Sequence, residues 1–135
     1  MSQYVIILKS HSLFPFMRVL FVCVGNSCRS QMAEAIARSQ GMTAESAGTH
    51  PAKEVSKQAL HVLADMEIDA SGLEPKNIST IDWKSFDKII SMGCGVQCPN
   101  IPIDEDWGLE DPVGGDVDIF RKTAKRIQEH IKNLA

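Results

Sequence analysis

The sequence predicts a single α/β domain in which a four-stranded parallel sheet is flanked by helices, a doubly wound arrangement. Two observations lead to this prediction. The chain has 135 residues, which is enough for one hydrophobic core. Short apolar runs alternate along it with segments of helical periodicity, an order typical of parallel sheets. Ligands of such sheets bind outside the carboxyl ends of the strands, so we expect the functional site there.

The first half of the domain is predicted to contain a strand, a helix and a second strand. Residues 18–23 read Arg-Val-Leu-Phe-Val-Cys without polar alternation, as expected of a central strand that is buried on both faces. Residues 30–40 carry apolar side chains on one helical face, and Gly41 follows as a stop signal. Residues 43–47 form a short second strand, which Gly48 ends.

The second half is predicted to contain two helices and two strands. Residues 55–66 have apolar side chains at spacings of three and four, which predicts a helix. Residues 87–92 form a third strand, and a fourth short run surrounds residues 101–103. Residues 120–134 form the closing helix, because their apolar side chains recur at intervals of four, three, four and three.

The first sixteen residues differ from the rest of the chain. Leu13-Phe14-Pro15-Phe16 breaks any regular pattern, and Met17 then precedes the first strand. We therefore divide the chain into an N-terminal extension, residues 1–16, and one domain, residues 17–135. The extension lies upstream of the true start if translation begins at Met17. The alternative is that it packs against the domain as an added edge segment.

Composition and charge argue against several classes of function. The chain has 14 Lys and Arg against 17 Asp and Glu, a net charge of −3, so we expect it to bind neither nucleic acid nor a membrane surface. Its apolar runs fall well short of the roughly 20 residues of a membrane-spanning helix, and its N-terminus lacks a secretory pattern. We expect a cytoplasmic monomer. Clustered cysteines in that reducing compartment are more often catalytic or metal-binding than structural.

The most informative segment is the loop that follows the first strand, Cys23-Val24-Gly25-Asn26-Ser27-Cys28-Arg29-Ser30. It joins a buried strand to a helix N-terminus, where backbone N–H groups and the helix dipole attract anions. Gly25 can adopt a positive φ without cost, Asn26 tolerates the left-handed region, and Arg29 can bind two oxygens of a tetrahedral anion. We therefore predict that Val24 to Ser30 bind an oxyanion beside a nucleophilic Cys23.

The same loop can supply a thiolate. A free cysteine thiol has a pKa near 8.5, so only about 3% of it is ionised at pH 7. Converging N–H groups and an arginine stabilise the anion, and the hydroxyls of Ser27 and Ser30 can donate further hydrogen bonds to Cys23, so no histidine base is needed. The alternative is that Cys23 is a small buried strand residue. That alternative would leave Gly25, Asn26 and Arg29 as coincidences.

These residues resemble the low-molecular-weight protein tyrosine phosphatases and, within that family, the thioredoxin-coupled arsenate reductases. The resemblance covers residues 17–135. It rests on residues 19–23 and 25–34, on Ser46-Ala47-Gly48, on Met92-Gly93-Cys94 with Cys98-Pro99, and on residues 107–112. It implies that Cys23 is the nucleophile, that Arg29 clamps the oxyanion and that Asp111 is the general acid. The alternative for Asp111 is a turn residue before Pro112.

The remaining cysteines distinguish a reductase from a phosphatase. Reducing arsenic from the +5 to the +3 state takes two electrons, which two thiols supply when they form a disulfide. The resemblance implies that Cys23 attacks arsenate, that Cys94 then attacks Cys23 as arsenite leaves, and that a Cys94–Cys98 disulfide results. Thioredoxin or another thiol reductant, such as glutathione with glutaredoxin or mycothiol, would reduce it, and no tightly bound cofactor is implied. The order of exchange stays open, because Cys94 and Cys98 are closer in sequence than in better-known reductases and Cys28 can compete.

Three other interpretations remain. A phosphatase that acts on phosphate monoesters through a phosphocysteine uses the same loop, but its family members generally carry aromatic residues after the Asp-Pro, where this chain has Val113-Gly114-Gly115. A regulatory protein that switches through its cysteines is a second possibility. The third is half of a zinc site at Cys94 and Cys98, which lacks a second ligand pair, so we expect no metal.

A monovalent cation site is the last feature that the resemblance brings in. Some relatives bind such a cation near the loop through an asparagine, a glutamate, a serine and an aspartate. Asn26, Glu34 and Ser46 match three of these ligands, whereas Ser79 stands where the aspartate is expected. That mismatch counts against cation dependence.

Overall fold

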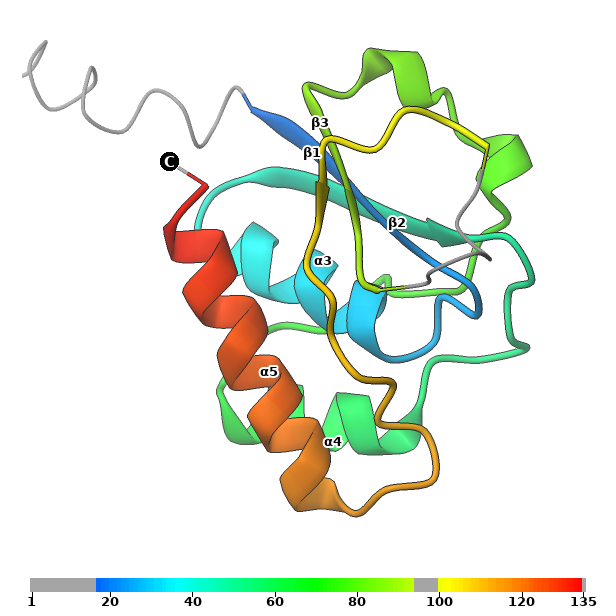
Figure 1. Ribbon diagram of the computed structural model, residues 1–135. Coiled ribbons are helices and arrows are strands. Elements are labelled where there is room, and N and C mark those ends of the chain that lie inside the picture. Colours follow the sequence, from blue (N-terminus) through cyan, green and yellow to red (C-terminus); the bar gives the residue numbers. More distant parts are fainter. Residues whose placement is uncertain (1–16, 94–99, 135) are drawn as a thin grey trace, which may run out of the picture.

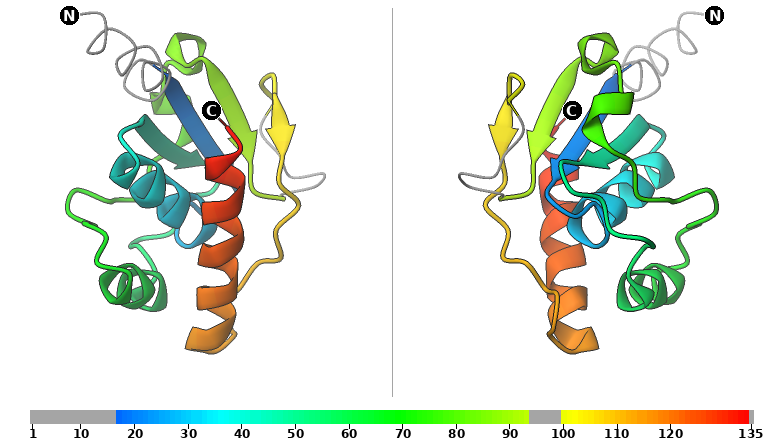
Figure 2. Two further views of the ribbon diagram at one scale, coloured as in Figure 1. Left: turned by 90° about the vertical axis from the view of Figure 1, so that its left-hand side faces the viewer. Right: turned by 90° about the vertical axis from the view of Figure 1, so that its right-hand side faces the viewer.

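The computed structural model describes residues 17–93 and 100–134. Four parallel strands form one sheet in the order β2-β1-β3-β4 (Figure 1). The strands are β1 (Arg18–Cys23), β2 (Thr43–Gly48), β3 (Lys88–Ser91) and β4 (Glu105–Asp106). The two-residue β4 lies beyond β3 at the edge of the sheet, as Figure 2 shows. The fold class that the sequence predicts is thereby confirmed.

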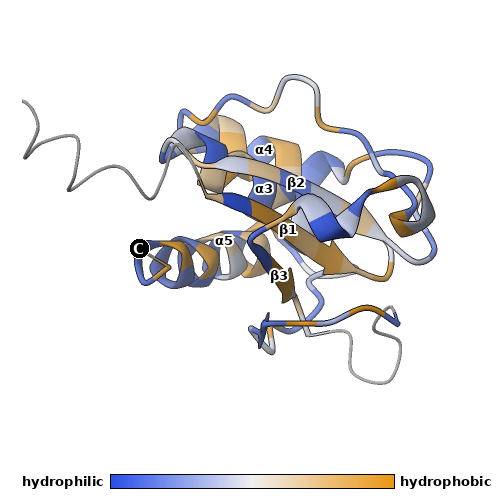
Figure 3. Ribbon diagram, turned by 90° about the horizontal axis from the view of Figure 1, so that it is seen from above, coloured by the Kyte–Doolittle hydropathy of each residue, from blue (hydrophilic) through white to orange (hydrophobic). Residues whose placement is uncertain are grey.

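Three α-helices share the larger hydrophobic core with one face of the sheet. They are α3 (Arg29–Ser39), α4 (Lys57–Asp65) and α5 (Val117–Lys132). Side-chain caps begin two of them, because Ser56 accepts a hydrogen bond from the N–H of Ala59 and Asp116 accepts one from that of Ile119. Hydrophobic and hydrophilic residues alternate around α5, which turns its apolar side to the core (Figure 3).

Within residues 17–93 and 100–134, no α-helix covers the opposite face of the sheet. The short 3-10 helices η1 (Ile78–Thr80) and η2 (Trp83–Ser85) lie there with neighbouring loop residues. Their partly buried apolar side chains pack against a smaller core on the sheet. That core consists of Leu20, Val22, Ala47 and Ile89. The two layers that a doubly wound fold requires are therefore present, but one of them is thin.

Burial on both faces explains the apolar sequence of β1. Val19, Phe21 and Cys23 belong to the larger core, whereas Leu20 and Val22 belong to the smaller one. Successive side chains of a strand point to opposite faces, so a central strand under two layers needs apolar residues throughout. The strand Arg18–Cys23 is at the predicted residues, and α3, β2 and β3 begin and end within one residue of their predictions.

The fourth strand was predicted at the wrong residues. Residues 101–103 are irregular, and Ile101 and Ile103 pack as partly buried side chains against the smaller core. The ladder with β3 begins later, where Ile90 pairs with Glu105. An apolar run marks burial, whereas strand pairing depends on backbone register. Similarly, Val55 and Leu134 are buried next to α4 and α5 but lie outside these helices.

The sheet topology predicts a ligand site at the carboxyl end of β1. From β1 the chain crosses to β2 on one side and later returns to β3 on the other, so the connections diverge there. Such switch points are where ligands of parallel sheets bind. None of the helices in residues 17–93 and 100–134 has the length and apolar character needed to cross a membrane. The extension predicted at residues 1–16 lies outside the described residues.

Candidate active site

A cavity of about 560 Å³ lies at the carboxyl end of β1. The loop after β1 forms one wall, with Cys23 and Arg29 at its two ends. The opposite wall comes from residues far along the chain: Gly93, Leu109, Glu110, Asp111 and Val113. Three of the residues singled out from the sequence, Cys23, Arg29 and Asp111, therefore meet at one cavity.

The carbonyl groups of residues 23–27 each accept a hydrogen bond from a residue that follows the loop motif or supports it. Those of Cys23, Val24, Gly25 and Ser27 accept hydrogen bonds from backbone N–H groups within residues 49–56, at 2.8 to 3.3 Å. The carbonyl of Asn26 accepts one from the side chain of Gln31 at 2.9 Å. In a trans peptide the N–H of the next residue points the opposite way from the carbonyl. The N–H groups of residues 24–28 are consequently turned away from these partners. All five residues line the cavity, and the N–H of Asn26 points at Cys23 Sγ.

The sulfur of Cys23 receives hydrogen bonds from this loop. The N–H of Asn26 donates to Sγ at 3.1 Å, and Ser30 Oγ lies 2.8 Å from Sγ. Cys23 is 3% exposed, at the boundary between the core and the cavity. Asn26 makes this turn possible by adopting φ of 48°, in the left-handed region. We expected that conformation at Gly25 as well, but only Asn26 adopts it within the loop.

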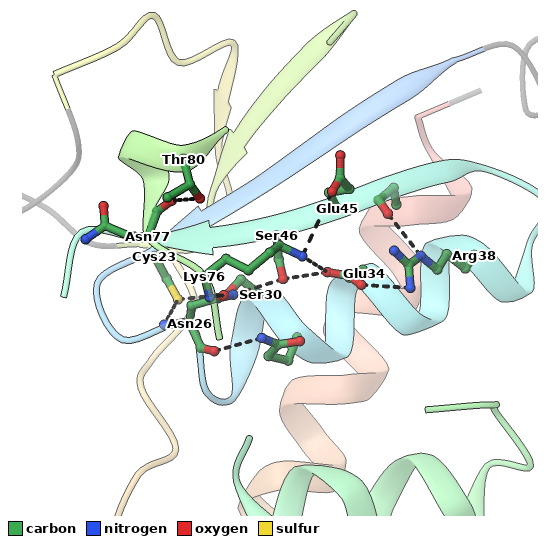
Figure 4. Close-up of polar contacts among 12 residues, drawn as sticks. Cys23, Asn26, Ser30, Glu34, Arg38, Glu45, Ser46, Lys76, Asn77 and Thr80 are labelled. Atoms are coloured by element: carbon green, nitrogen blue, oxygen red, sulfur yellow. Dashed lines mark hydrogen bonds and ion pairs between the residues drawn. The ribbon is translucent and has the colours of Figure 1, made fainter. Parts of the chain in front are cut away.

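The side chain of Asn26 determines which way the hydroxyl of Ser30 points (Figure 4). Its Oδ1 accepts from the backbone N–H of Lys76 at 2.8 Å, so its Nδ2 must donate. Nδ2 donates to Ser30 Oγ at 2.8 Å and to Ser46 Oγ at 2.9 Å. The one proton of Ser30 is then free to point at Cys23, which stabilises a thiolate. Ser30, which was predicted to bind the oxyanion and to donate to Cys23, is fully buried, and its hydroxyl contacts the sulfur.

Arg29 is held in place from outside the loop. It is the first residue of α3, and its Nη1 donates to the carbonyl of Leu109 at 2.8 Å and to that of Met92 at 3.2 Å. Its Nη2 lies 4.0 Å from Oδ2 of Asp111, whose side chain is 57% exposed. The guanidinium is thus anchored on one side, with its remaining donors available near Asp111. The positive end of α3 adds to the same field.

Of the three other cysteines, Cys28 belongs to the described residues. Cys28 is a buried residue of the loop, and burial raises the pKa of its thiol despite hydrogen bonds from Ser27 and Ser56. Cys94 and Cys98, predicted to complete the thiol cascade, lie outside the described residues. In the part of the chain that is described, no group of three or more His, Cys, Asp and Glu side chains could hold a metal ion.

Two residues shape the site although the sequence showed no sign of their contacts with it. A Cβ at Gly48 would lie 2.5 Å from the carbonyl oxygen of Val24, so only glycine lets β2 approach the loop so closely. Lys76 lies at the candidate cation ligands Asn26, Glu34 and Ser46, where Ser79 was expected; Ser79 itself is exposed in η1. Both residues lie outside the loop motif in the sequence, so the motif does not indicate that they contact the loop.

Known proteins share this fold and much of this sequence. An arsenate reductase solved in a phosphate-binding state superimposes with a TM-score of 0.80 and 36% identity, over 88% of this chain and 96% of that one. A glutaredoxin arsenate reductase of Synechocystis is 37% identical over 87% of this chain and 95% of its own. A thioredoxin-dependent arsenate reductase of Corynebacterium glutamicum has a TM-score of 0.69 and 30% identity, over 98% of this chain and 72% of that one.

A family model that covers almost the whole described chain agrees with these similarities. The low molecular weight phosphotyrosine protein phosphatase model matches residues 18–135, which include the loop, its supporting strands and Asp111. This protein belongs to the low molecular weight phosphotyrosine protein phosphatase family.

Proposed function

We propose that this protein reduces arsenate to arsenite. The observation that carries the proposal is the surrounding of Cys23, whose sulfur accepts hydrogen bonds from Asn26 and Ser30 at the edge of a cavity beside Arg29. These donors stabilise a thiolate, and the same N–H groups and Arg29 would hold a tetrahedral anion over it. Reduction rather than hydrolysis is supported by the two further cysteines, Cys94 and Cys98, and by the arsenate reductases among the relatives.

The first step forms a bond between Cys23 Sγ and arsenic. As this bond forms, one arsenic–oxygen bond breaks, and the departing oxygen takes up protons and leaves as water. Asp111 is proposed to give it a proton, because its carboxyl group stands on the opposite wall of the cavity near Arg29. The product is an arsenic(V) group bound to Cys23.

The second stage moves two electrons from sulfur to arsenic. The thiolate of Cys94 attacks the sulfur of Cys23, so a sulfur–sulfur bond forms and the sulfur–arsenic bond breaks. The electron pair of that bond stays on arsenic, which leaves as arsenite in the +3 state. The thiolate of Cys98 then attacks Cys94 and releases Cys23, and the enzyme is left with a Cys94–Cys98 disulfide.

A thiol-containing protein must restore the reduced enzyme. We infer a thioredoxin as this partner, because an intramolecular disulfide is reduced by a pair of thiols. The relatives include both a glutaredoxin arsenate reductase and a thioredoxin-dependent one, so glutathione with glutaredoxin is the competing donor. Such donors belong to reducing compartments, which supports an enzyme of the cytoplasm. We propose that it acts as a monomer.

A phosphatase activity is the second candidate, since phosphate has the shape of arsenate and the family is named for it. Val113 lines the cavity after Asp111-Pro112 and is 64% exposed, and the described residues around the cavity include no aromatic side chain. A phosphotyrosine ring would lack a flat surface on which to stack. We therefore propose only weak hydrolysis of aryl phosphates.

Coupled turnover tests the proposal. Purified protein is mixed with arsenate, thioredoxin, thioredoxin reductase and NADPH, and NADPH oxidation is followed beside Cys94→Ser and Cys98→Ser variants. We expect turnover by the wild-type protein alone. If both variants turned over at the wild-type rate, the cascade would be contradicted. Replacing thioredoxin by glutathione and glutaredoxin identifies the donor, and hydrolysis of an aryl phosphate at a rate that neither variant changes would support the phosphatase.

A further inference from the structure

Four charged side chains, from α3, β2 and the segment before η1, lie close together, and none of them lines the cavity. Glu34 of α3 is only 1% exposed, and two cations face it: Arg38 Nη1 lies 2.9 Å from Oε2 and Lys76 Nζ lies 3.9 Å from Oε1. Lys76 Nζ also lies 4.0 Å from Oε1 of Glu45 (Figure 4). Two carboxylates and two cations give this cluster no net charge, although Glu34 is buried.

The residues do not fit a bound monovalent cation, which the family resemblance had brought in at Asn26, Glu34 and Ser46. Such an ion needs free oxygen lone pairs. Oδ1 of Asn26 already accepts from the backbone of Lys76, and Ser46 Oγ donates to Glu34 at 2.7 Å while it accepts from Asn26. The ammonium group of Lys76 lies 3.9 Å from Glu34 Oε1 and 4.0 Å from Glu45 Oε1. Among the described residues, Glu34 Oε2 makes no hydrogen bond, and the charge that faces it is Arg38 Nη1, at 2.9 Å. An added cation would also give the balanced cluster a surplus of positive charge.

We infer that Lys76 is a built-in substitute for that cation and a positioning residue for Cys23. Its ammonium lies 3.9 Å from Glu34 Oε1, the oxygen that accepts the hydrogen bond of Ser46 at 2.7 Å, so Lys76 holds in place the acceptor that fixes the proton of Ser46. Because Ser46 donates its proton to Glu34, its oxygen accepts a hydrogen bond from Asn26 Nδ2. The second proton of Nδ2 is donated to Ser30 Oγ. The hydroxyl proton of Ser30 is thereby directed toward Cys23. The inference rests on the proposed role of Cys23 as nucleophile.

The side chain of Lys76 can be tested apart from its backbone. Every substitution except proline keeps the N–H that binds Asn26, so Lys76→Met removes the ammonium alone. Without it Glu34, Glu45 and Arg38 leave the cluster with one uncompensated negative charge. Glu34 then either moves away from Ser46, which frees Ser46 to turn, or draws a cation from solution. The second route predicts that a small cation rescues the variant.

The experiment follows alkylation of Cys23 by iodoacetamide at pH 7, with the modified peptide identified by mass spectrometry. Wild-type protein and Lys76→Met are compared in potassium chloride and in choline chloride of equal ionic strength, since choline is too large for the cluster. We expect the wild-type rate to be the same in both salts. The variant is expected to react roughly tenfold more slowly in choline, and potassium should restore it.

Two further variants act as controls. Lys76→Arg keeps a cation and should match the wild-type protein without potassium, and Lys122→Met, at an exposed lysine of α5, should do the same. Potassium stimulation of the wild-type protein, or an unchanged Lys76→Met rate in choline, would overturn the inference. If Lys76→Met does not fold, the wild-type protein and Lys76→Arg still decide it. Alkylation requires no arsenate, so failure of arsenate reduction would contradict the proposed function separately.

Discussion

The guanidinium of Arg29 donates a hydrogen bond of 2.8 Å to the carbonyl oxygen of Leu109. The same nitrogen donates to the carbonyl of Met92 at 3.2 Å, so one side chain ties α3 to the two segments that form the opposite wall of the cavity. Arg29 is therefore positioned before any anion arrives. Preorganised donors of this kind stabilise developing charge without having to reorient during the reaction.

Replacing Arg29 by lysine should separate charge from geometry. Lysine keeps the positive charge but cannot bind two carbonyl oxygens and an anion with one planar group. We expect kcat/KM for arsenate to fall by roughly 100-fold, the scale seen when one preorganised donor is lost. Steady-state kinetics check this, with circular dichroism to establish that the fold is retained. A variant as active as the wild-type protein would contradict the role of Arg29.

Cys28 should be dispensable for the first chemical step. Burial raises the pKa of its thiol, so Cys28 is protonated at neutral pH, where it is a weak nucleophile. We expect Cys28→Ser to keep arsenate turnover within about threefold of the wild type and Cys23→Ser to abolish it. Coupled NADPH oxidation measures both. Loss of turnover in both variants would instead indicate that Cys28 takes part in thiol exchange.

Gly48 should tolerate no side chain. A Cβ there would lie 2.5 Å from Val24 O and 3.0 Å from Asn26 Cβ, so the loop must move. We expect Gly48→Ala to lose about 1–3 kcal/mol of unfolding free energy, as overpacked sites do, and most of its turnover. Gly72→Ala is the matched control: its φ of 80° also strains a side chain, but nothing lies within 4 Å of the added atom. Gly72→Ala should lower the unfolding free energy. At temperatures well below its melting point it should still reduce arsenate at the wild-type rate.

Asp111 should matter for bond breaking more than for binding. We expect Asp111→Asn to lower kcat by roughly 100-fold, because asparagine keeps the shape but cannot give up a proton. Glu110→Gln, at a neighbouring residue that lines the same cavity, should change kcat little. Measured kcat and KM for arsenate distinguish the two. Equal effects of both substitutions would indicate a general loss of negative charge rather than proton donation by Asp111.

The edge strand should lose stability in acid. A hydrogen bond of 2.8 Å from Lys88 lowers the pKa of Glu105 below its ordinary value. A lowered pKa in the folded state stabilises the fold above the ordinary carboxyl range, and this stabilisation is lost as the pH falls through the lowered value. Because both side chains are about a third exposed, we expect the contribution to be under about 1 kcal/mol. Denaturant unfolding of Lys88→Met should therefore show a loss at pH 7 that shrinks as the pH is lowered through the acidic range.

The parts of the site that were predictable are the local ones. The strand, the loop and the helix from Arg18 to Ser39 follow from apolar periodicity and from residues that are adjacent in sequence. Lys76 and Gly48 could not be found in this way, because they reach Asn26 and Val24 through space. The same limit misplaced the fourth strand, because the partly buried Ile101 and Ile103 resemble a strand in sequence, whereas backbone pairing puts the strand at Glu105. The roles of Cys94 and Cys98 stay predictions.

A single-turnover reaction tests the central claim most directly. Fully reduced protein is mixed with excess arsenate without any external reductant, and the arsenite formed and the free thiols remaining are counted after quenching. The account predicts about one arsenite per protein, with the loss of two thiols and a disulfide that mass spectrometry places between Cys94 and Cys98. It predicts none from Cys23→Ser. Reduced, folded protein that forms no arsenite, or arsenite formed equally by the Cys23→Ser variant, would contradict it.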